Sequence, residues 1–520
     1  MGSTFMGLET ARRGLVAQQS ALYTTGNNIS NANTLGYTRQ RVDLEQSQSF
    51  PGVGQNAPRI AGQLGTGVIA GSVSRIRDSF LDTQYRSESS KLGYWENRTT
   101  ALGNLETIMN EPSESGLSSS MDAFWESLQD LATDPQNSGA RAVVRQRGIA
   151  VSETFNYLHK TVSAEKSDAK NELGVAEKAV NTILTQLNQI NKQIGSVEPN
   201  GYLPNDLYDQ RDSLLDELSS YANIKVSYEA SGGNALAQAE GKAVVTLVDD
   251  KGNSLGTLVD KNGYNSIKVN SNADDSAVTS ITIGDTEINI NNFESTGKLK
   301  SIVEAYGYED ADGNLKGIYN DMLTELDNLA YTFATKFNEV HQEGMSPNEI
   351  EAGVNQSISF FADSESADGS ITDRSGFASR ISISSSIESS LDNIANASPG
   401  TDPSKATLGD ATYVSKLADI INQKYDYGNN SEMSNFRNYY EGVIGSMAVS
   451  AQEAEKMTSN ATTLQQTVEN KRMSTSAVSL DEEMTNMIQF QQAYNAAARM
   501  ISLSDELLDT IINGMGVGGR

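Results

Sequence analysis

Two histidines are the only side chains here whose ordinary pKa lies near neutral pH, so acid–base and metal chemistry depend on their surroundings. His159 and His341 lie far apart in the sequence, and neither belongs to an HExxH zinc motif. The chain has no cysteine, which excludes disulfides, zinc–thiolate sites and thiol nucleophiles. We therefore interpret each histidine as a helix residue rather than a catalytic base.

Two other stretches have the glycines or carboxylates of a ligand-binding loop without its spacing. Leu64–Gly71 (LGTGVIAG) is not GxGxxG and has no acidic ribose partner at the expected distance. Asp310–Asn314 (DADGN) lacks the ligand spacing of an EF-hand. Asp481, Glu482 and Glu483 stand at a predicted helix start, where the helix dipole favours carboxylates. The sequence thus predicts turns and a helix start, with no catalytic residue, cofactor or metal site.

The charge balance of the chain excludes several classes of partner. With 67 Asp and Glu against 39 Lys and Arg, the formal net charge is -28. Such a charge repels a phosphate backbone and an anionic bilayer, so we expect neither nucleic-acid nor membrane binding. No apolar run could span a bilayer, and the first residues do not form a cleaved secretory signal. The protein is expected either to stay in the cytosol or to be exported without a cleaved signal.

The start of the chain repeats an apolar residue every seven positions, as in a narrow coiled-coil seam. The pattern predicts a helix over Thr4–Thr25 that ends at Gly26 and Asn27, which can adopt the left-handed conformation. The residues of the repeat are Leu8, Leu15, Leu22 and Ile29.

Asparagines crowd the segment after this helix. Their amides bond to nearby backbone, which disfavours a helix interior and favours a turn. Leu35-Gly36 predicts a second turn, and Thr38–Val42 an extended segment. The residues singled out are Asn28, Asn31, Asn33, Thr34, Gly36, Tyr37, Arg39 and Gln40.

The end of the chain predicts a matching helix. Ser479 and Glu482 have the spacing of a capping box, and Asn513-Gly514 is a stop signal. Each terminal helix lacks a partner next to it in sequence, so we expect the two to pack together. The second stripe is wider than one partner covers, which favours contacts with other subunits; an ordinary helix pair within the chain is the alternative. The helix residues singled out are Leu480, Asp481, Glu482, Met484, Met487, Phe490, Gln491, Tyr494, Ala498, Ile501, Leu508 and Ile512.

Helical spacing dominates the middle of the chain, interrupted by β patterns. Long helices are predicted over 140–195 and from Phe436 to Val468, and a hairpin is predicted around Gly284-Asp285. The predicted fold is α+β and multidomain, with paired terminal helices as a coiled-coil-like inner domain. The predicted domains are 1–75 with 478–520 (inner), 76–222 with 298–345 and 411–477 (discontinuous helical), 223–297 (inserted β domain) and 346–410 (β- and turn-rich outer segment).

The two ends together resemble the axial proteins of the bacterial flagellum, the family of rod, hook and hook-associated subunits. Asn27–Val42 (NNISNANTLGYTRQRV) resembles the segment after that family's first helix, and Ser476–Met515 resembles its C-terminal helix. Gly36–Gln40 (GYTRQ) is similar to hook-associated members, whereas rod and hook subunits usually show Gly-Phe-Lys. Interior stretches such as Pro204–Ser219 and Leu326–Gly344 agree, so the resemblance is close to full length.

This resemblance implies a structural subunit without catalysis or cofactor. It implies type III export without a cleaved signal, assisted by a chaperone, and assembly outside the cell. There, copies of the chain would form a ring on the hook protein, below a second junction protein and flagellin. Asn28, Asn31, Asn33 and Thr34 would shape the turn after the inner helix. Tyr37, Arg39 and Gln40 would contact the next domain or a neighbouring subunit, with Arg39 paired to a carboxylate.

Three other functions compete with this interpretation. A hook or rod subunit is the nearest, although the GYTRQ and Phe490–Tyr494 (FQQAY) runs speak against it. A surface binding module or adhesin could use the β region but would leave the matched terminal helices unexplained. A hydrolase is disfavoured because the chain lacks cysteine, paired histidines and a GxSxG elbow.

Overall fold

A computed structural model describes residues 4–52, 54, 62–111, 113, 116–400, 403–428 and 433–514. Its contacts divide the chain into two compact units. Three helices contribute residues to both units: α2 (Ser79–Met109), α4 (Ser138–Val197) and α11 (Phe436–Ser476). Unit 1 comprises Met1–Lys91, Ala179–Ile267 and Ala461–Arg520, and unit 2 comprises Leu92–Lys178 and Lys268–Asn460.

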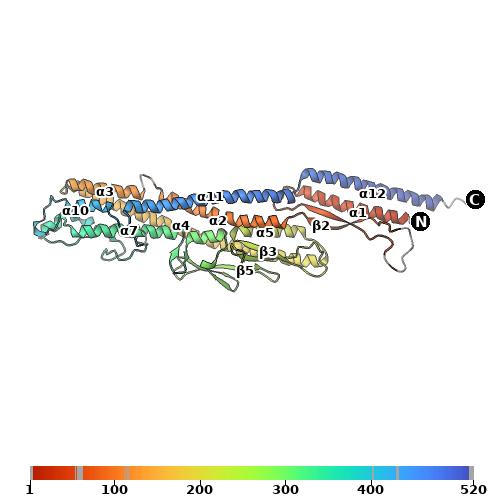
Figure 1. The fold of residues 1–520 in the computed structure, drawn as a ribbon, viewed down its shortest axis with the longest axis horizontal. Helices are drawn as coiled ribbons and strands as arrows, with labels where there is room; N and C mark the ends of the chain where they lie inside the picture. The colour runs from red at the N-terminus through yellow and green to blue at the C-terminus, as the bar shows by residue number, and fades with distance from the viewer. Residues whose placement is uncertain are drawn as a thin grey trace, which may run out of the picture. The chain divides into compact units, whose positions relative to one another are not determined.

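The terminal helices of unit 1 lie side by side. α1 (Thr4–Ser30) packs along α12 (Leu480–Gly514), and the start of α1 lies at the same end of the pair as the end of α12 (Figure 1). α1 also packs against the hairpin of β1 and β2. The small side chains of Ala17 and Ala21 in α1 are buried. The predicted pairing of the two terminal helices is confirmed.

The predicted end of the first helix is wrong. α1 continues through Gly26 and Asn27 and ends at Ser30, five residues beyond Thr25. The left-handed position falls instead at Gly36, with a φ of 79°. Local signals favoured an earlier end, but Asn28 is buried and bonded to β1 and α12, and these tertiary contacts hold the extra turn in helical form.

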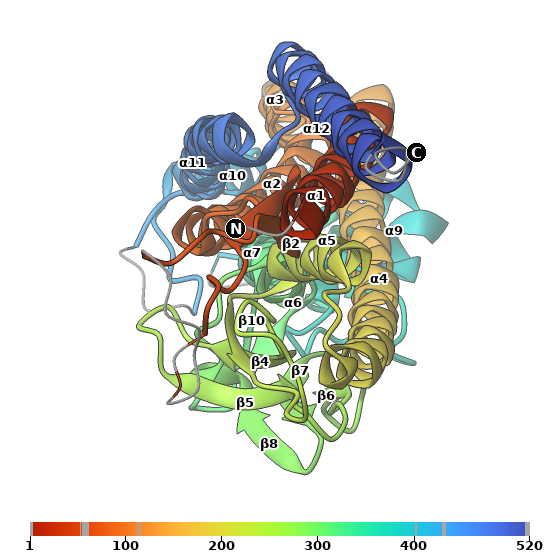
Figure 2. The same ribbon diagram turned by 90° about the vertical axis from the view of Figure 1, so that its right-hand side faces the viewer.

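A hairpin and a helix complete the surroundings of the terminal pair. β1 (Gln40–Gln46) pairs antiparallel with β2 (Val68–Arg75), from Gln40↔Arg75 to Gln46↔Val68. α5 (Asn205–Tyr221) bonds to both strands of this hairpin and lies beside β2 in Figure 2. It leads into a three-stranded sheet, ordered β3-β4-β5, whose strands are β3 (Ile224–Glu229), β4 (Lys242–Val248) and β5 (Ser254–Val259).

A five-stranded sheet, ordered β10-β9-β7-β6 with β8 paired to β7, belongs to unit 2 except for Ile267, the first residue of β6. The predicted hairpin is confirmed: Ile283 pairs with Thr286 across a two-residue turn, and Gly284 has a φ of 58°. The strands are β6 (Ile267–Ser271), β7 (Val278–Ile283), β8 (Thr286–Asn289), β9 (Tyr308–Glu309) and β10 (Leu315–Lys316).

Aromatic side chains fill the helical core of unit 2. Phe124, Phe333 and Phe337 are fully buried, and their ring centroids lie 5.3–6.5 Å apart. They come from α3 (Leu117–Thr133) and α7 (Ile318–Glu343). The remaining elements are α6 (Lys298–Tyr306), α8 (Pro347–Ala352), α9 (Ser385–Ser389), α10 (Thr412–Asp419), β11 (Phe361–Asp363), β12 (Ile381–Ile383) and the 3-10 turns η1 (Glu198–Asn200), η2 (Ile290–Asn292), η3 (Phe377–Ser379), η4 (Leu391–Asn393), η5 (Pro403–Lys405) and η6 (Ile420–Asn422).

The division into units runs through one predicted domain. Residues up to Ile267 belong to unit 1 and residues from Lys268 to unit 2, and both positions lie inside the stretch 223–297 predicted as one β domain. The stretch 346–410, predicted to be rich in β structure and turns, contains the paired β11 and β12 and several short helices. None of the described helices is both long and apolar enough to cross a membrane.

Candidate assembly site

The end of α1, the turn after it and the start of α12 meet at one buried asparagine. Asn28 is 1% exposed, and its Nδ2 donates to the Gln40 carbonyl at 2.8 Å and to Glu483 Oε2 at 3.1 Å. Its Oδ1 accepts the Gln40 N–H at 3.0 Å and the Tyr37 hydroxyl at 2.8 Å. An amide has two N–H groups and two lone pairs, so all four positions of this side chain are used.

Arg39 joins the same point to α12. Its Nε lies 2.7 Å from Glu483 Oε1, and its Nη1 lies 2.6 Å from Glu482 Oε2. The Glu483 side chain is only 2% exposed, so its charge is held in a dry site and needs the guanidinium as partner. The carboxylate partner expected for Arg39 thus lies within the chain, at the start of α12. We call Asn28, Tyr37, Arg39, Gln40, Glu482 and Glu483 the assembly site.

The backbone of Arg39 links two further segments. Its N–H donates to the Ser476 carbonyl at 2.9 Å, and its carbonyl accepts the Ile76 N–H at 2.8 Å. Ser476 ends α11, and Ile76 follows β2 directly. The extended chain at Arg39 is therefore held between the end of α11 and the exit of the hairpin.

Burial fixes the chemical state of Tyr37. Burial, together with the nearby carboxylates of Asp209, Asp206 and Glu483, raises the pKa of the Tyr37 phenol well above its usual value. The hydroxyl therefore keeps its proton and donates it to Asn28 Oδ1.

The predicted capping box forms only in part. Ser479 Oγ accepts the Glu482 N–H at 3.5 Å, which is the long half of the motif. The Glu482 carboxylate turns to Arg39 instead of reaching back to the backbone of Ser479. A charge-assisted bond to a guanidinium is stronger than a bond to a neutral N–H, and this explains the departure from the predicted motif.

The turn after α1 is stabilised by its own side chains. Asn31 Nδ2 donates to the Asn27 carbonyl at 3.0 Å and to Asn27 Oδ1 at 2.9 Å. The Thr34 hydroxyl donates to Asn31 Oδ1 at 3.2 Å. Asn33 and Gly36 are exposed. Of the residues expected to shape the turn, Asn31 and Thr34 bond within it, whereas Asn28 bonds across to β1 and α12.

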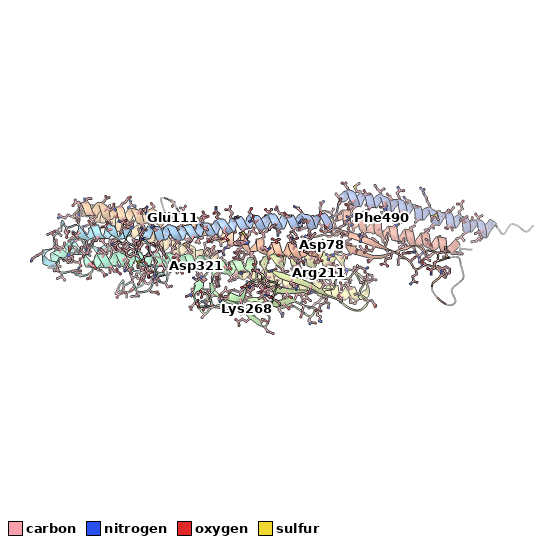
Figure 3. All side chains as sticks on the ribbon, viewed as in Figure 1. Asp78, Glu111, Arg211, Lys268, Asp321 and Phe490 are labelled. Carbon is pink, nitrogen blue, oxygen red and sulfur yellow. The ribbon has the colours of Figure 1, made fainter. Side chains whose placement is uncertain are left out.

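The predicted helix stripes divide between half-buried and exposed positions. The α1 repeat Leu8, Leu15, Leu22 and Ile29 is half-buried. On α12, where Figure 3 labels Phe490, the half-buried members are Met487, Phe490, Tyr494, Ala498, Ile501 and Leu508. The exposed members are Leu480, Asp481, Glu482, Met484, Gln491 and Ile512.

Other functional residues were missed by sequence reasoning. Glu483 was assigned only to the helix dipole, although it is the buried acceptor for both Asn28 and Arg39. Asp209 Oδ2 accepts the Thr38 N–H at 3.1 Å, and Asn205 donates to the Val73 carbonyl at 2.7 Å. The spacing of polar residues along α5 was the available signal, but such a stripe ordinarily marks a solvated face.

Neither histidine is placed for acid–base catalysis. His341 is 2% exposed; its Nδ1 lies 2.7 Å from the Ile358 carbonyl, and its Nε2 accepts the Ala395 N–H at 3.0 Å. Burial lowers the pKa of His159, which lies 3.8 Å from Asp327. Within the described ranges, no group of three or more metal-ligating side chains could hold an ion. What the site can do is join segments through directional bonds.

Comparison with known proteins places the chain among flagellar proteins. The model of the flagellar hook-associated protein FlgK helical domain matches residues 102–358. The models of the flagellar basal body rod FlgEFG protein C-terminal region and of the flagella basal body rod protein match residues 469–514 and 8–38.

Individual relatives agree with these matches. The chain is 48% identical over 523 residues to flagellar hook-associated protein 1 of Bacillus subtilis, with both chains fully covered. It is 28% identical to the protein of the same name from Salmonella typhimurium, covering 68% of this chain and 58% of the other. Its fold resembles that of the flagellar hook junction protein from Burkholderia pseudomallei, with a TM-score of 0.58 and 13% identity over 75% of this chain and 100% of that one.

Proposed function

Because this chain belongs to the flagellar hook-associated protein 1 family, and so is a structural component of the flagellar axis, we propose that it forms the ring of subunits between hook and filament. In this role it adapts the hook to the filament and permits filament assembly. It does not catalyse a reaction. The observation that carries the proposal is the 48% identity along the whole chain to a hook-associated protein.

The assembly site supports this role. It closes the α1–α12 pair on itself through Asn28 and Glu483 and leaves part of the α12 stripe uncovered. Leu480 is 48% exposed, Met484 57% and Ile512 71%. Neighbouring copies of the chain would cover these side chains, since apolar side chains that gather on an exposed face commonly mark an interaction surface.

The remaining partners and the domain arrangement follow from the same proposal. The ring sits on the hook protein and carries a second junction protein and flagellin. The subunit reaches the outside of the cell through the type III route with an export chaperone and without a cleaved signal. The inner domain is 1–75 with 478–520, the helical domain is 76–222 with 298–345 and 411–477, and the outer parts are 223–297 and 346–410.

Deletion of the gene followed by electron microscopy of the cells tests the junction role. Hooks without filaments, with flagellin shed into the medium, are expected, and the wild-type gene supplied in trans should restore filaments. Cells without hooks would assign the protein to the rod or hook instead. Normal filaments would overturn the structural role and favour a surface binding module.

A single substitution tests the contribution of the turn. Asn31→Leu removes the bonds to Asn27 and Thr34, and we expect the variant to fail in assembly onto hooks. Asn33→Leu is the matched control, because Asn33 is an exposed asparagine of the same turn. Equal assembly of both variants with wild type would refute a role for the turn.

A further inference from the structure

One face of α5 carries four polar side chains that point into the protein. Asn205, Asp209, Asp212 and Asp216 follow one another at steps of four, three and four, which places them in one row along the helix. Asn205 is 9% exposed, Asp209 8% and Asp212 3%. A polar stripe on a helix ordinarily faces solvent, so its burial here calls for partners. We call these four residues the α5 seam.

The first half of the seam holds the chain where it leaves the assembly site. Asp209 accepts the Thr38 N–H at 3.1 Å and Arg75 Nη1 at 2.7 Å. Asn205 donates to the Val73 carbonyl at 2.7 Å and to Gln40 Oε1 at 3.3 Å. These contacts fix the base of the β1–β2 hairpin on both strands.

The far end of the seam holds the chain where it returns to α12. Asp216 bonds to Arg472 of α11 and lies 2.8 Å from Arg86 Nε of α2. Arg472 stands one helical turn before Ser476, whose carbonyl accepts the Arg39 N–H. One face of α5 therefore bonds to both chain segments that lead to the α1–α12 pair.

Asp212 lies at the centre of this arrangement. Arg75 Nη2 and Arg77 Nη1 each lie 2.9 Å from Asp212 Oδ2, and Arg86 Nη2 lies 3.4 Å from Oδ1. Burial would raise the pKa of Asp212, but the charges of Arg77, Arg75, Arg211 and Arg86 outweigh it and hold the pKa well below its usual value. Figure 3 labels Arg211, the α5 neighbour of Asp212.

A network of buried ion pairs fixes the relative position of the elements it joins more than it stabilises the fold. Apolar residues of similar volume often replace buried ion pairs without loss of stability. Arginine–carboxylate bonds, however, have a fixed fork geometry, whereas apolar contacts permit sliding. The network is therefore suited to holding two elements at a set angle.

We propose that the α5 seam fixes the angle between α5 and the α1–α12 pair, with Asp212 as the central positioning residue. The inference goes beyond the ring proposed above, because it concerns the isolated chain and holds whether or not the chain assembles.

Distances between spin labels in the purified monomer test this inference. The natural chain has no cysteine, so labels can be attached through Tyr23→Cys on α1 and Gln210→Cys on α5, both at exposed positions. A second pair, Tyr23→Cys with Gln492→Cys on α12, reports on the terminal pair alone. Asp212→Asn is compared with wild type and with Asp122→Asn, which removes an exposed ion pair to Arg437.

The expected result is a change in one distance only. In Asp212→Asn the α1–α5 distribution broadens or gains a second maximum, while the α1–α12 distribution keeps its position and width; Asp122→Asn changes neither. An unchanged α1–α5 distribution overturns the inference, and so does equal broadening of both, because that indicates general loosening. If Asp212→Asn does not fold, Arg472→Gln, which releases only the α11 end of the seam, is measured with the same criteria.

Discussion

Exchange of one NH₂ group for oxygen at Asn28 should break the assembly site. Asn28→Asp keeps the size of the side chain but removes the donors to the Gln40 carbonyl and to Glu483 Oε2. Those bonds contribute about 1 kcal/mol and about 2 kcal/mol, the second being larger because its acceptor is charged. The introduced carboxyl would also face the buried Glu483 carboxylate, at a cost of up to about 4 kcal/mol if both are ionised.

Protonation limits this penalty. The introduced carboxyl can take a proton rather than face Glu483 as an anion, so its pKa in the folded state is raised. The total cost should be about 5 kcal/mol at pH 8 and should shrink as the pH falls, because protonation then becomes cheaper. A protonated carboxyl regains one O–H donor, which can bond to Glu483. The pH dependence therefore separates the effects at Glu483 from the lost bond to the Gln40 carbonyl, whose cost stays.

Hydrogen exchange of the Gln40 amide measures the cost of the Asn28→Asp substitution directly, since that N–H donates to Asn28 Oδ1. After correction for the intrinsic exchange rate, the variant should exchange roughly five-thousandfold faster than wild type at pH 8. Glu483→Gln in the same chain removes the opposing charge and offers an amide donor, so the pair should show a stabilising coupling in a double-mutant cycle. Unchanged exchange at Gln40, or an equal cost at pH 5 and pH 8, would refute the reasoning.

Two further predictions concern other parts of the chain. His341 must stay neutral to accept the Ala395 N–H, and burial lowers its pKa from 6.5 to about 4. The free energy of unfolding should therefore fall by roughly 3 kcal/mol between pH 6.5 and pH 4, because the unfolded chain takes up the proton first. Urea unfolding of the His341→Gln variant should lack this loss. Gly241→Ala places a Cβ 2.2 Å from the Glu229 carbonyl oxygen at a φ of 82°, whereas Gly252→Ala at 86° meets nothing within 4 Å; the first should cost at least about 2 kcal/mol and clearly more than the second in urea unfolding.

Periodicity was sufficient for the elements whose signals are local. The long helices, the Gly284-Asp285 hairpin and the pairing of the terminal helices all follow from apolar spacing and turn residues. The end of α1 did not follow, because Gly26 and Asn27 give a stop signal that the tertiary bonds of Asn28 override. The sequence contains both Asn28 and Glu483, but it does not show that these residues, 455 positions apart, form a hydrogen bond.

The same limit applies to charged residues. Spacing placed Glu482 in a capping box, and only the fold shows that Arg39 takes its carboxylate. Likewise the aspartates of α5 have the spacing of an exposed face, and burial appears only once the arginines of β2, α2 and α11 converge on them. Helical periodicity shows which residues share one face of a helix. It does not show which charged residues, distant in sequence, pack against that face.

The difference between half-buried and exposed positions of α12 connects these observations to assembly. Its half-buried positions, such as Phe490 and Ile501, are in part covered within the chain, whereas Leu480, Met484 and Ile512 remain 48–71% exposed. Full burial of such a side chain contributes about 1.5–3 kcal/mol, so a chain that leaves them in water gives up stability that neighbours could supply. Under the proposed function, the buried polar bonds of Asn28 and Glu483 set the geometry of the helix pair before assembly, and the uncovered apolar side chains provide the free energy of joining. A subunit built this way would enter assembly with its directional bonds already satisfied, so that only the apolar face would remain to be covered.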